Sequence, residues 1–343
     1  MQTPKCNARM NLCARARLLC RGVVLLGSLL ALLPALLPAL GQRYVLAQAP
    51  AWPTRTITLV VGFDVGGVTD ILARLFSKSL STSLGQPVIV ENKPGAAGIL
   101  AATAVARSAP DGYTLLFAAA SQMLAAPKLQ GAKFSAIADF AAITPIGANT
   151  FVLVIRPSIP TRTIPEFVSY AKAASPTYGS PGAGSVTHLL SALFISSAGF
   201  EATHVPFRGG DQALAALLGG QIDMYFSPFG NIVPYLGTKQ VTLLGVASEQ
   251  RMAQLPDVPT IGEFYPNTVL PSWNGFMAPA HTPSEIIEKL AQSLAAAVKD
   301  PDIASTMSRL GVEPQVLAPA VFAEQLAGDG SRFDAAISAA KLR

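Results

Sequence analysis

Apolar, β-branched runs alternate with helical patterns along most of this chain, and this alternation limits the fold more than any other feature. The connections between the two kinds of segment are short, which predicts a largely parallel sheet with helices on both faces. The expected strands are 56–61, 88–90, 114–118, 151–155, 203–207, 224–227, 241–246 and 275–278. The expected helices are 71–84, 97–107, 164–174, 186–198, 212–218, 284–298, 303–310 and 319–340.

Two segments have the pattern of crossings between lobes. The apolar run at 151–155 leads into a proline-containing turn, and the segment 272–279 ends at a proline. A chain that crosses, builds a second lobe and crosses back forms two doubly wound lobes joined by a two-strand hinge. We therefore expect one lobe from 48–153 plus 275–343 and another from 154–274. Ligands of such sheets bind beyond the carboxyl ends of the strands, so the site is expected in the cleft, where hinge closure buries a ligand.

The clearest candidate for a binding loop is the glycine-containing turn that joins the first strand to the first helix. Gly66 and Gly67 permit backbone angles closed to other residues and let a ligand approach the main chain. Thr69 and Asp70 fit a helix start, whose unpaired N–H groups and positive dipole end attract an anion. The spacing matches a phosphate-binding P-loop, but Val68 stands where that motif needs lysine, which disfavours a nucleotide. A glycine turn without any ligand stays open as the alternative.

The first 47 residues have the features of a secretory signal peptide and are not expected in the fold. Basic residues precede an uncharged apolar stretch at 22–41, and small residues near Ala47 offer a cleavage site. A retained anchor is the alternative, against which the prolines within the stretch argue. The leader holds all three cysteines, six of the 25 basic residues and none of the 20 acidic ones. The exported chain then has no disulfide, no thiolate metal site and no charge pattern for nucleic-acid binding.

A secreted α/β enzyme acting on a small acid is the rival class of function, and the residues that it needs are poorly arranged. No Gly-x-Ser-x-Gly nucleophile elbow occurs in the sequence. The histidines are His188, His204 and His281, and no pair of them has the spacing of a metal site. Asp70 and Asp223 are better interpreted as helix-start and turn carboxylates than as an acid–base pair. We therefore expect no catalysis, no metal and no cofactor.

Eight short motifs follow one another in order along the chain. They are Trp52-Pro53, FDVGGVTDILAR from Phe63, LGQPVIVENKPGAAG from Leu84, APDGYTLL from Ala109, GSPGAGSVTHL from Gly179, HVPFRGGDQALAALLGGQIDM from His204, LPDVPTIGE from Leu255 and APAHTPSEIIEKL from Ala278. In this order they resemble the extracytoplasmic solute receptors of tripartite tricarboxylate transporters, the Bug-type periplasmic binding proteins. The resemblance covers nearly the whole exported chain and implies a type II periplasmic binding fold.

The resemblance also implies a function: capture of a small carboxylated organic solute in the periplasm, largely through main-chain N–H groups and ordered water. The implied partners are membrane permease subunits of a tripartite tricarboxylate transporter, or a sensor kinase, and nothing in the sequence argues against a monomer. The site residues come from the first glycine loop, a facing glycine loop and nearby strand ends. They are Phe63, Val65, Gly66, Gly67, Thr69, Asp70, Ser121, Gln122, Gly182, Ala183, Gly184, Ser185, His188, Phe207 and Ser227. A tight turn without a ligand is the alternative for 182–185, and a core aromatic is the alternative for Phe207.

Three features depart from the family pattern. Asp64 and Val65 replace the residues that commonly precede the paired glycines, and a carboxylate there repels an anion unless it points outward or meets a cation. Ser227 and Pro228 occupy a place where an Asp-Asn pair is frequent, which weakens any specificity borrowed from amino-acid-binding relatives. The surrounding segment 224–229 is rich in aromatic residues. Together these features hint at a less polar acid.

Overall fold

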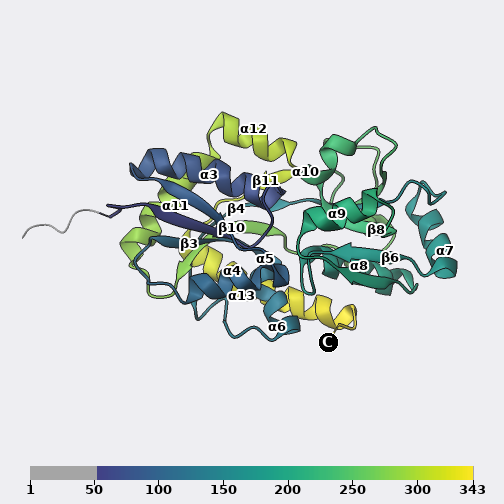
Figure 1. Ribbon diagram of the computed structural model, residues 1–343, viewed down its shortest axis with the longest axis horizontal. Helices are drawn as coiled ribbons and strands as arrows, with labels where there is room; N and C mark the ends of the chain where they lie inside the picture. Colours follow the sequence, from purple (N-terminus) through teal and green to yellow (C-terminus); the bar gives the residue numbers. More distant parts are fainter. Residues whose placement is uncertain (1–51, 343) are drawn as a thin grey trace, which may run out of the picture. The chain divides into compact units, whose positions relative to one another are not determined.

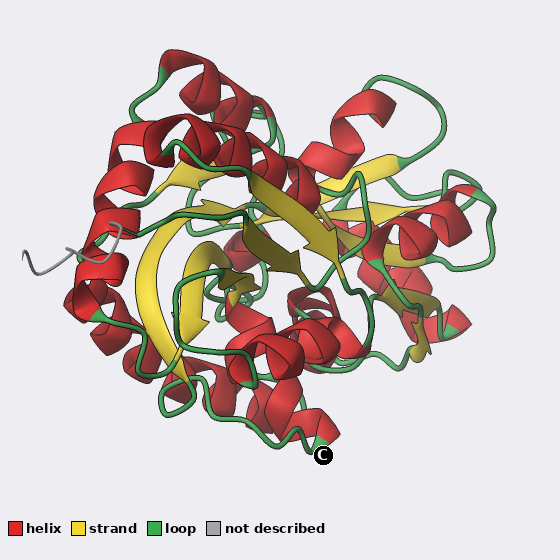
Figure 2. Ribbon diagram, turned by 60° about the vertical axis from the view of Figure 1, so that its left-hand side comes forward, coloured by secondary structure: helices red, strands yellow, loops and turns green. Residues whose placement is uncertain are grey.

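Two β-sheets, each with helices on both faces, form the frame of the computed structural model, which describes residues 52–342 (Figures 1 and 2). We call the part built on the six-stranded sheet the first lobe and the part built on the five-stranded sheet the second lobe. The predicted two-lobe α/β architecture is therefore confirmed. The predicted leader and its cleavage site near Ala47 lie outside the described residues.

The first lobe has the strand order β11-β4-β10-β3-β1-β2. Its strands are β1 (Ile57–Val61), β2 (Val88–Asn92), β3 (Thr114–Ala119), β4 (Phe140–Asn149), β10 (Trp273–Pro279) and β11 (Val312–Pro314). Its helices are α3 (Val68–Leu84), η2 (Ala96–Gly98), α4 (Ile99–Ala106), α5 (Ala120–Leu124), α6 (Ala126–Gln130), α11 (Ser284–Val298), α12 (Pro301–Arg309) and α13 (Pro319–Ala339). Successive side chains of a strand point to opposite faces, so Leu59 packs with α3 and α11 while Val60 packs with α4.

The second lobe has the strand order β7-β6-β8-β5-β9. Its strands are β5 (Phe151–Ile155), β6 (Thr177–Ser180), β7 (Thr203–Pro206), β8 (Met224–Pro228) and β9 (Thr242–Ala247). Its helices are α7 (Ile164–Ala174), α8 (Val186–Ala198), α9 (Gly210–Leu218), α10 (Phe229–Ile232), η3 (Val233–Tyr235) and η4 (Ile261–Glu263). All of β5 is buried, with Val152 facing α9 and Leu153 facing α7 and α8. This double burial explains its unbroken apolar sequence.

The chain passes between the two sheets at two places. Thr150 alone separates β4 from β5, and β10 returns the chain to the first sheet at Trp273. The lobe boundaries expected after 153 and 274 fall inside β5 and β10 and are wrong by a few residues, because each strand pairs within a single sheet. The C-terminal helix α13 packs on β4 and α5 of the first lobe and on α8 of the second, so it adds a further connection (Figure 1).

Both sheets are mixed, which corrects the expectation of largely parallel sheets. β1 pairs in parallel with β2 and β3, whereas β10 and β4 run antiparallel to their neighbours, and β5 runs antiparallel to β8 and β9. Parallel neighbours in a sheet are built through crossover connections, whereas β10 enters the first sheet from the second lobe and runs antiparallel to β3 and β4. The strand β4 was missed altogether because Pro145 interrupts its pattern. A bulge in its pairing with β10 accommodates this proline.

Candidate functional site

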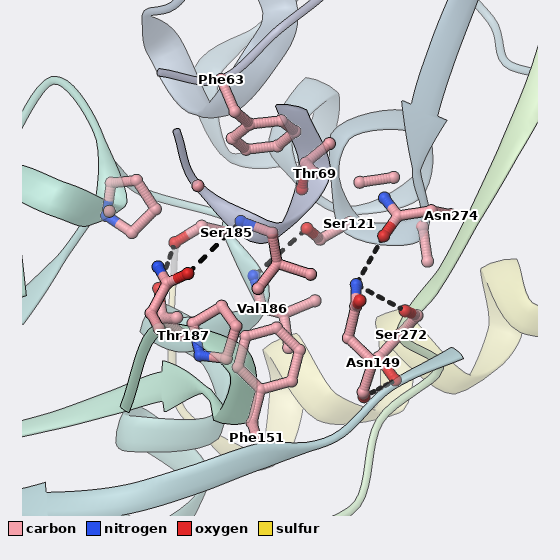
Figure 3. A pocket seen from close by; sticks show the side chains of 18 of the residues that line it. Phe63, Thr69, Ser121, Asn149, Phe151, Ser185, Val186, Thr187, Ser272 and Asn274 are labelled. Atoms are coloured by element: carbon pink, nitrogen blue, oxygen red, sulfur yellow. Dashed lines mark hydrogen bonds between the residues drawn. The ribbon is translucent and has the colours of Figure 1, made fainter. Parts of the chain in front are cut away.

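A cavity between the two lobes is the candidate site (Figure 3). Its volume is about 80 Å³, several times the roughly 10–15 Å³ that one water molecule needs. Both lobes and both crossings contribute to its walls. The lining residues are Phe63, Asp64, Gly67, Val68, Thr69, Ala119, Ala120, Ser121, Asn149, Phe151, Pro181, Ser185, Val186, Thr187, Gly210, Asp211, Tyr225, Pro228, Asn231, Ser272, Trp273 and Asn274.

The loop between β1 and α3 forms one wall, and Asp70 holds it in shape. Gly66 has a φ of +92°, a left-handed conformation that favours glycine, and Gly67 is the N-cap of α3. One carboxylate oxygen of Asp70 accepts hydrogen bonds from the Gly66 N–H and from Arg74 Nε, both at 2.9 Å. The other accepts from Asn92 Nδ2 at 2.8 Å. Burial acts to raise the pKa of Asp70, but these hydrogen bonds outweigh burial and lower it.

The loop between β6 and α8 forms the facing wall. Ser185 is the N-cap of α8, and its hydroxyl accepts from the His188 N–H at 3.3 Å and donates to the Gly182 carbonyl at 2.8 Å. Gly184 has a φ of +83°. A side chain at 184 would place its Cβ 2.5 Å from Cα of Ala126 in the first lobe, so only glycine allows the two backbones to approach this closely.

Two hydrogen bonds cross between the lobes at the helix starts. The N–H of Val68, the first residue of α3, donates to Oδ1 of Asn231 in the second lobe at 3.3 Å. The N–H of Val186, the first residue of α8, donates to Oγ of Ser121 in the first lobe at 3.1 Å. Each lobe therefore provides an acceptor for a first-turn N–H of the other, which has no partner within its own helix. These bonds require the lobes to be close together.

A group of polar side chains lies where the chain crosses between the lobes (Figure 3). Asn149 Nδ2 donates to Oδ1 of Asn274 at 2.6 Å, and Asn274 Nδ2 donates to the Ala118 carbonyl at 3.3 Å. The Ser272 hydroxyl donates to the Asn149 carbonyl at 2.7 Å. Oδ1 of Asn149 is buried and has no partner among the described residues. The crossings thus offer the cavity an unused acceptor.

Two carboxylates, one from each lobe, also line the cavity. Oδ2 of Asp64 lies directly against Gly209, where a Cβ would collide with it. Oδ1 of Asp211 lies 3.7 Å from the position of a Cβ on Gly67. Each carboxylate therefore lies against the N-cap glycine of a helix in the opposite lobe. Burial raises the pKa of Asp64, and burial together with the charges of Asp64 and Asp70 raises the pKa of Asp211. The predicted anion-binding helix start at Gly67 thus faces a carboxylate of the protein itself.

The structure brings some of the predicted site residues to the cavity wall and leaves others behind it. Those on the wall are Phe63, Gly67, Thr69, Ser121 and Ser185. A second group supports the wall through hydrogen bonds or close backbone contacts and does not line the cavity: Gly66, Asp70, Gln122, Gly182, Ala183, Gly184 and His188.

Three predicted residues lie away from the cavity. The side chain of Val65 is 65% exposed. Phe207 packs at the edge of the second lobe's core, as its alternative interpretation expected. Ser227 is buried and its hydroxyl donates to the Pro228 carbonyl at 3.1 Å. The side chains of these three residues therefore do not line the cavity, although their positions near strand ends suggested that they would.

His188 stabilises the second glycine loop from inside the lobe. Its Nδ1 accepts a hydrogen bond from the Gly184 N–H at 3.2 Å, and its ring lies 4.2 Å from the ring of His204. His204 Nε2 in turn is 2.7 Å from Oγ of Ser180. Burial, and secondarily the neighbouring His204, lowers the pKa of His188 to about 4. His188 is therefore a neutral acceptor at neutral pH.

The predicted site residues do not include four polar residues of the cavity wall, Asn149, Asn231, Ser272 and Asn274. Asn274 lies in a fully buried strand, and a buried amide within an apolar run was the available signal for it. Asn231 and Asn149 reach the cavity only through the packing of the two lobes, which no local pattern encodes.

Within residues 52–342, no helix is long and apolar enough to cross a membrane, and no group of three or more acidic, histidine or cysteine side chains could hold a metal ion. A larger groove of about 770 Å³ adjoins the cavity at Asn149, Ser272 and Trp273. Its walls contain none of the predicted site residues and neither of the α3 and α8 helix starts. Size alone therefore does not make it the candidate site.

Comparisons with known proteins agree on one family. Residues 72–340 match the family described as the tripartite tricarboxylate transporter family receptor. The chain is 36% identical to a UPF0065 protein of Bordetella bronchiseptica over 78% of this chain and 80% of the relative. It is similar to the solved periplasmic binding protein BugD, with 29% identity, a TM-score of 0.80 and coverage of 85% of this chain and 99% of BugD. It is also similar to MatC of Rhodopseudomonas palustris, solved with bound malate, with 33% identity, a TM-score of 0.79 and coverage of 83% and 100%.

Proposed function

The chain belongs to the tripartite tricarboxylate transporter receptor family, and we propose that its interlobe cavity captures a small organic acid for delivery to membrane permease subunits. The family is one of solute receptors, and the periplasmic binding protein fold is shared with BugD. MatC was solved with malate, a small dicarboxylate, which supports the same class of ligand for this chain. Export to the periplasm by the leader of residues 1–47 is part of the proposal.

The observation that carries the proposal is the cavity's construction from both lobes. Thr69 and Ser121 of the first lobe and Ser185 and Thr187 of the second present hydroxyl groups to the same space (Figure 3). The crossing bonds from Val68 and Val186 described above form only when the lobes close. A ligand held there contacts both lobes, so its binding energy favours the closed arrangement.

The proposed mechanism is capture without chemical change. The solute enters while the lobes are apart, makes hydrogen bonds to the walls, and is covered as the lobes approach. The closed surface is then the form that a permease distinguishes from the empty receptor. A ligand shifts this equilibrium only as far as it binds the closed form more tightly than the open one.

A thermal-shift screen against mono-, di- and tricarboxylates, amino acids and aromatic acids tests the proposal. A ligand that binds only the folded protein stabilises it by about 2.7 kcal/mol at a hundredfold excess over its Kd. The variant Gly67→Asp places a third carboxylate beside Asp211 and is expected to lose the shift. The exposed Gly328, with open space around it, provides the matched control Gly328→Asp, which is expected to keep it. A flat response of the wild type across the whole panel would overturn the proposed function.

A further inference from the structure

The charge of the cavity is unexpected for a receptor of anions. Two of its lining residues are carboxylates, Asp64 and Asp211, and none of the lining residues in the described chain is lysine, arginine or histidine. A dicarboxylate placed in this cavity meets two like charges and no basic side chain. Repulsion of this kind between partly buried groups is screened less than repulsion between fully exposed charges. The cavity therefore selects for something other than negative charge alone.

The buried side-chain atoms that line the cavity of the described chain and lack a hydrogen-bond partner are both acceptors. Oδ2 of Asp64 and Oδ1 of Asn149 are both buried without a partner among residues 52–342. The orientation of Asn149 is fixed, because its Nδ2 already donates to Asn274 Oδ1 and to the Ser272 carbonyl. A buried acceptor without a donor costs free energy, which a ligand that donates hydrogen bonds recovers.

At each of two helix starts that face the cavity, the first N–H group already has an acceptor within the protein. The first N–H of α3 donates to Asn231, and the first N–H of α8 donates to Ser121. The carboxylate of Asp211 lies against Gly67 at the start of α3, and that of Asp64 lies against Gly209 at the start of α9. An additional carboxylate at the start of α3 therefore meets the charge of Asp211, whereas a cation is attracted by both acids.

We propose, on the basis of the function proposed above, that the solute is amphoteric: besides a carboxylate, it carries an ammonium group that Asp64 and Asp211 hold between the lobes. An ammonium group supplies three hydrogen-bond donors and a positive charge, and hydrogen bonds between charged groups are stronger than those between neutral ones. Its carboxylate is received by the hydroxyl groups of Thr69, Ser121 and Thr187 on the same cavity walls.

This arrangement also couples recognition to closure. Asp64 belongs to the first lobe and Asp211 to the second, so the two carboxylates come together as the lobes close. In the empty receptor their repulsion opposes closing, and a cation between them turns that repulsion into attraction. The raised pKa values of both acids fit carboxylates that lack a cationic partner within the protein.

Isothermal titration with succinate, malate and aspartate tests this inference directly. The three acids share a four-carbon skeleton and differ at one carbon, which carries hydrogen, hydroxyl or ammonium. Aspartate is expected to bind about tenfold or more tightly than the other two, the gain typical of one charged hydrogen-bonded contact. The pairs glutarate with glutamate and adipate with 2-aminoadipate extend the comparison to longer solutes, and the amino member is expected to be the tighter one at each length that binds.

Charge-removing variants assign the effect to the two acids. Asp64→Asn and Asp211→Asn keep the side-chain shape and are expected to weaken binding of the amino acid about tenfold, without weakening binding of the plain diacid. The exposed Asp257, outside the cavity, gives the control Asp257→Asn, which is expected to change neither. Thermal unfolding without ligand verifies that each variant folds.

The possible outcomes separate this inference from the proposed function. Plain diacids that bind as tightly as their amino analogues would overturn the inference and leave the receptor function intact. Equal affinities of wild type and both variants for the amino acid would do the same. Failure of every acid in the series to bind would overturn the inference, and the proposed function would fall with it only if the wider thermal-shift panel also gave a flat response.

Discussion

Gly184→Ala is the substitution that most clearly separates lobe closure from folding. The residue has a φ of +83°, and the new Cβ would lie 2.5 Å from Cα and 2.9 Å from N of Ala126 in the first lobe. The left-handed backbone alone costs an alanine about 1–2 kcal/mol, which lowers Tm by a few degrees. The collision adds a second effect, because backbone atoms cannot rotate away and the loops must separate. If the closed fraction falls to about a tenth, the apparent affinity falls about tenfold.

Gly199→Ala is the matched control for this prediction. Gly199 has a φ of +67° but no atom within 4 Å of its Cβ position, so it carries the backbone strain without the collision. Urea unfolding is expected to show similar losses of stability for both variants. Titration with the acid found by the screen, and the radius of gyration from small-angle scattering, are expected to change only for Gly184→Ala. Equal binding by the two variants would refute the reasoning that this contact limits closure.

Two further predictions follow from buried polar contacts. Burial lowers the pKa of His188 from 6.5 to about 4. As the pH falls from 6.5 to about 4, the unfolded chain therefore binds a proton at this residue before the folded protein does, and the free energy of unfolding decreases by about 3 kcal/mol. His188→Asn is expected to remove this contribution to the pH dependence of the free energy of unfolding, measured by urea unfolding at several pH values. The control His281→Asn, at an exposed position, is expected to keep it. An unchanged pH dependence in His188→Asn would contradict the assignment to His188. Ser121→Ala removes the acceptor of the Val186 N–H and is expected to weaken acid binding several-fold, consistent with about 1 kcal/mol for one hydrogen bond. The exposed Ser169→Ala is the control, and equal titration curves for the two serine variants would contradict a role in closure.

Local sequence patterns predicted the elements in which one pattern of apolar residues continues from end to end. The bounds expected for β5, α7, α8 and α11 agree with the structure, because each has an uninterrupted apolar run or a clear helical period. β4 escaped prediction because a proline lies in its middle, and the mixed strand directions follow from long-range pairing. The expected lobe boundaries differ by a few residues from the ends of β5 and β10, because the sheet that a strand joins is also decided by long-range pairing.

The candidate site was predicted in part. Glycine turns before helices pointed to both loops that form the cavity walls, and Thr69 and Ser185 line the cavity. The sequence could not reveal that the first N–H groups of α3 and α8 donate across the cleft, since this depends on how the lobes meet. Nor could it place Asp211 against the start of α3. The warning that Asp64 repels an anion came from the sequence, and the structure adds the second carboxylate that makes this charge a property of the whole cavity.

A crystal structure of the protein with the acid that the screen identifies tests the central claim most directly. We predict density for the acid in the cavity between the lobes, in contact with Thr69 and Ser121 of the first lobe and with Thr187 of the second. An acid bound to one lobe only, or in the larger groove lined by residues such as Arg251 and Gln315, would contradict the account.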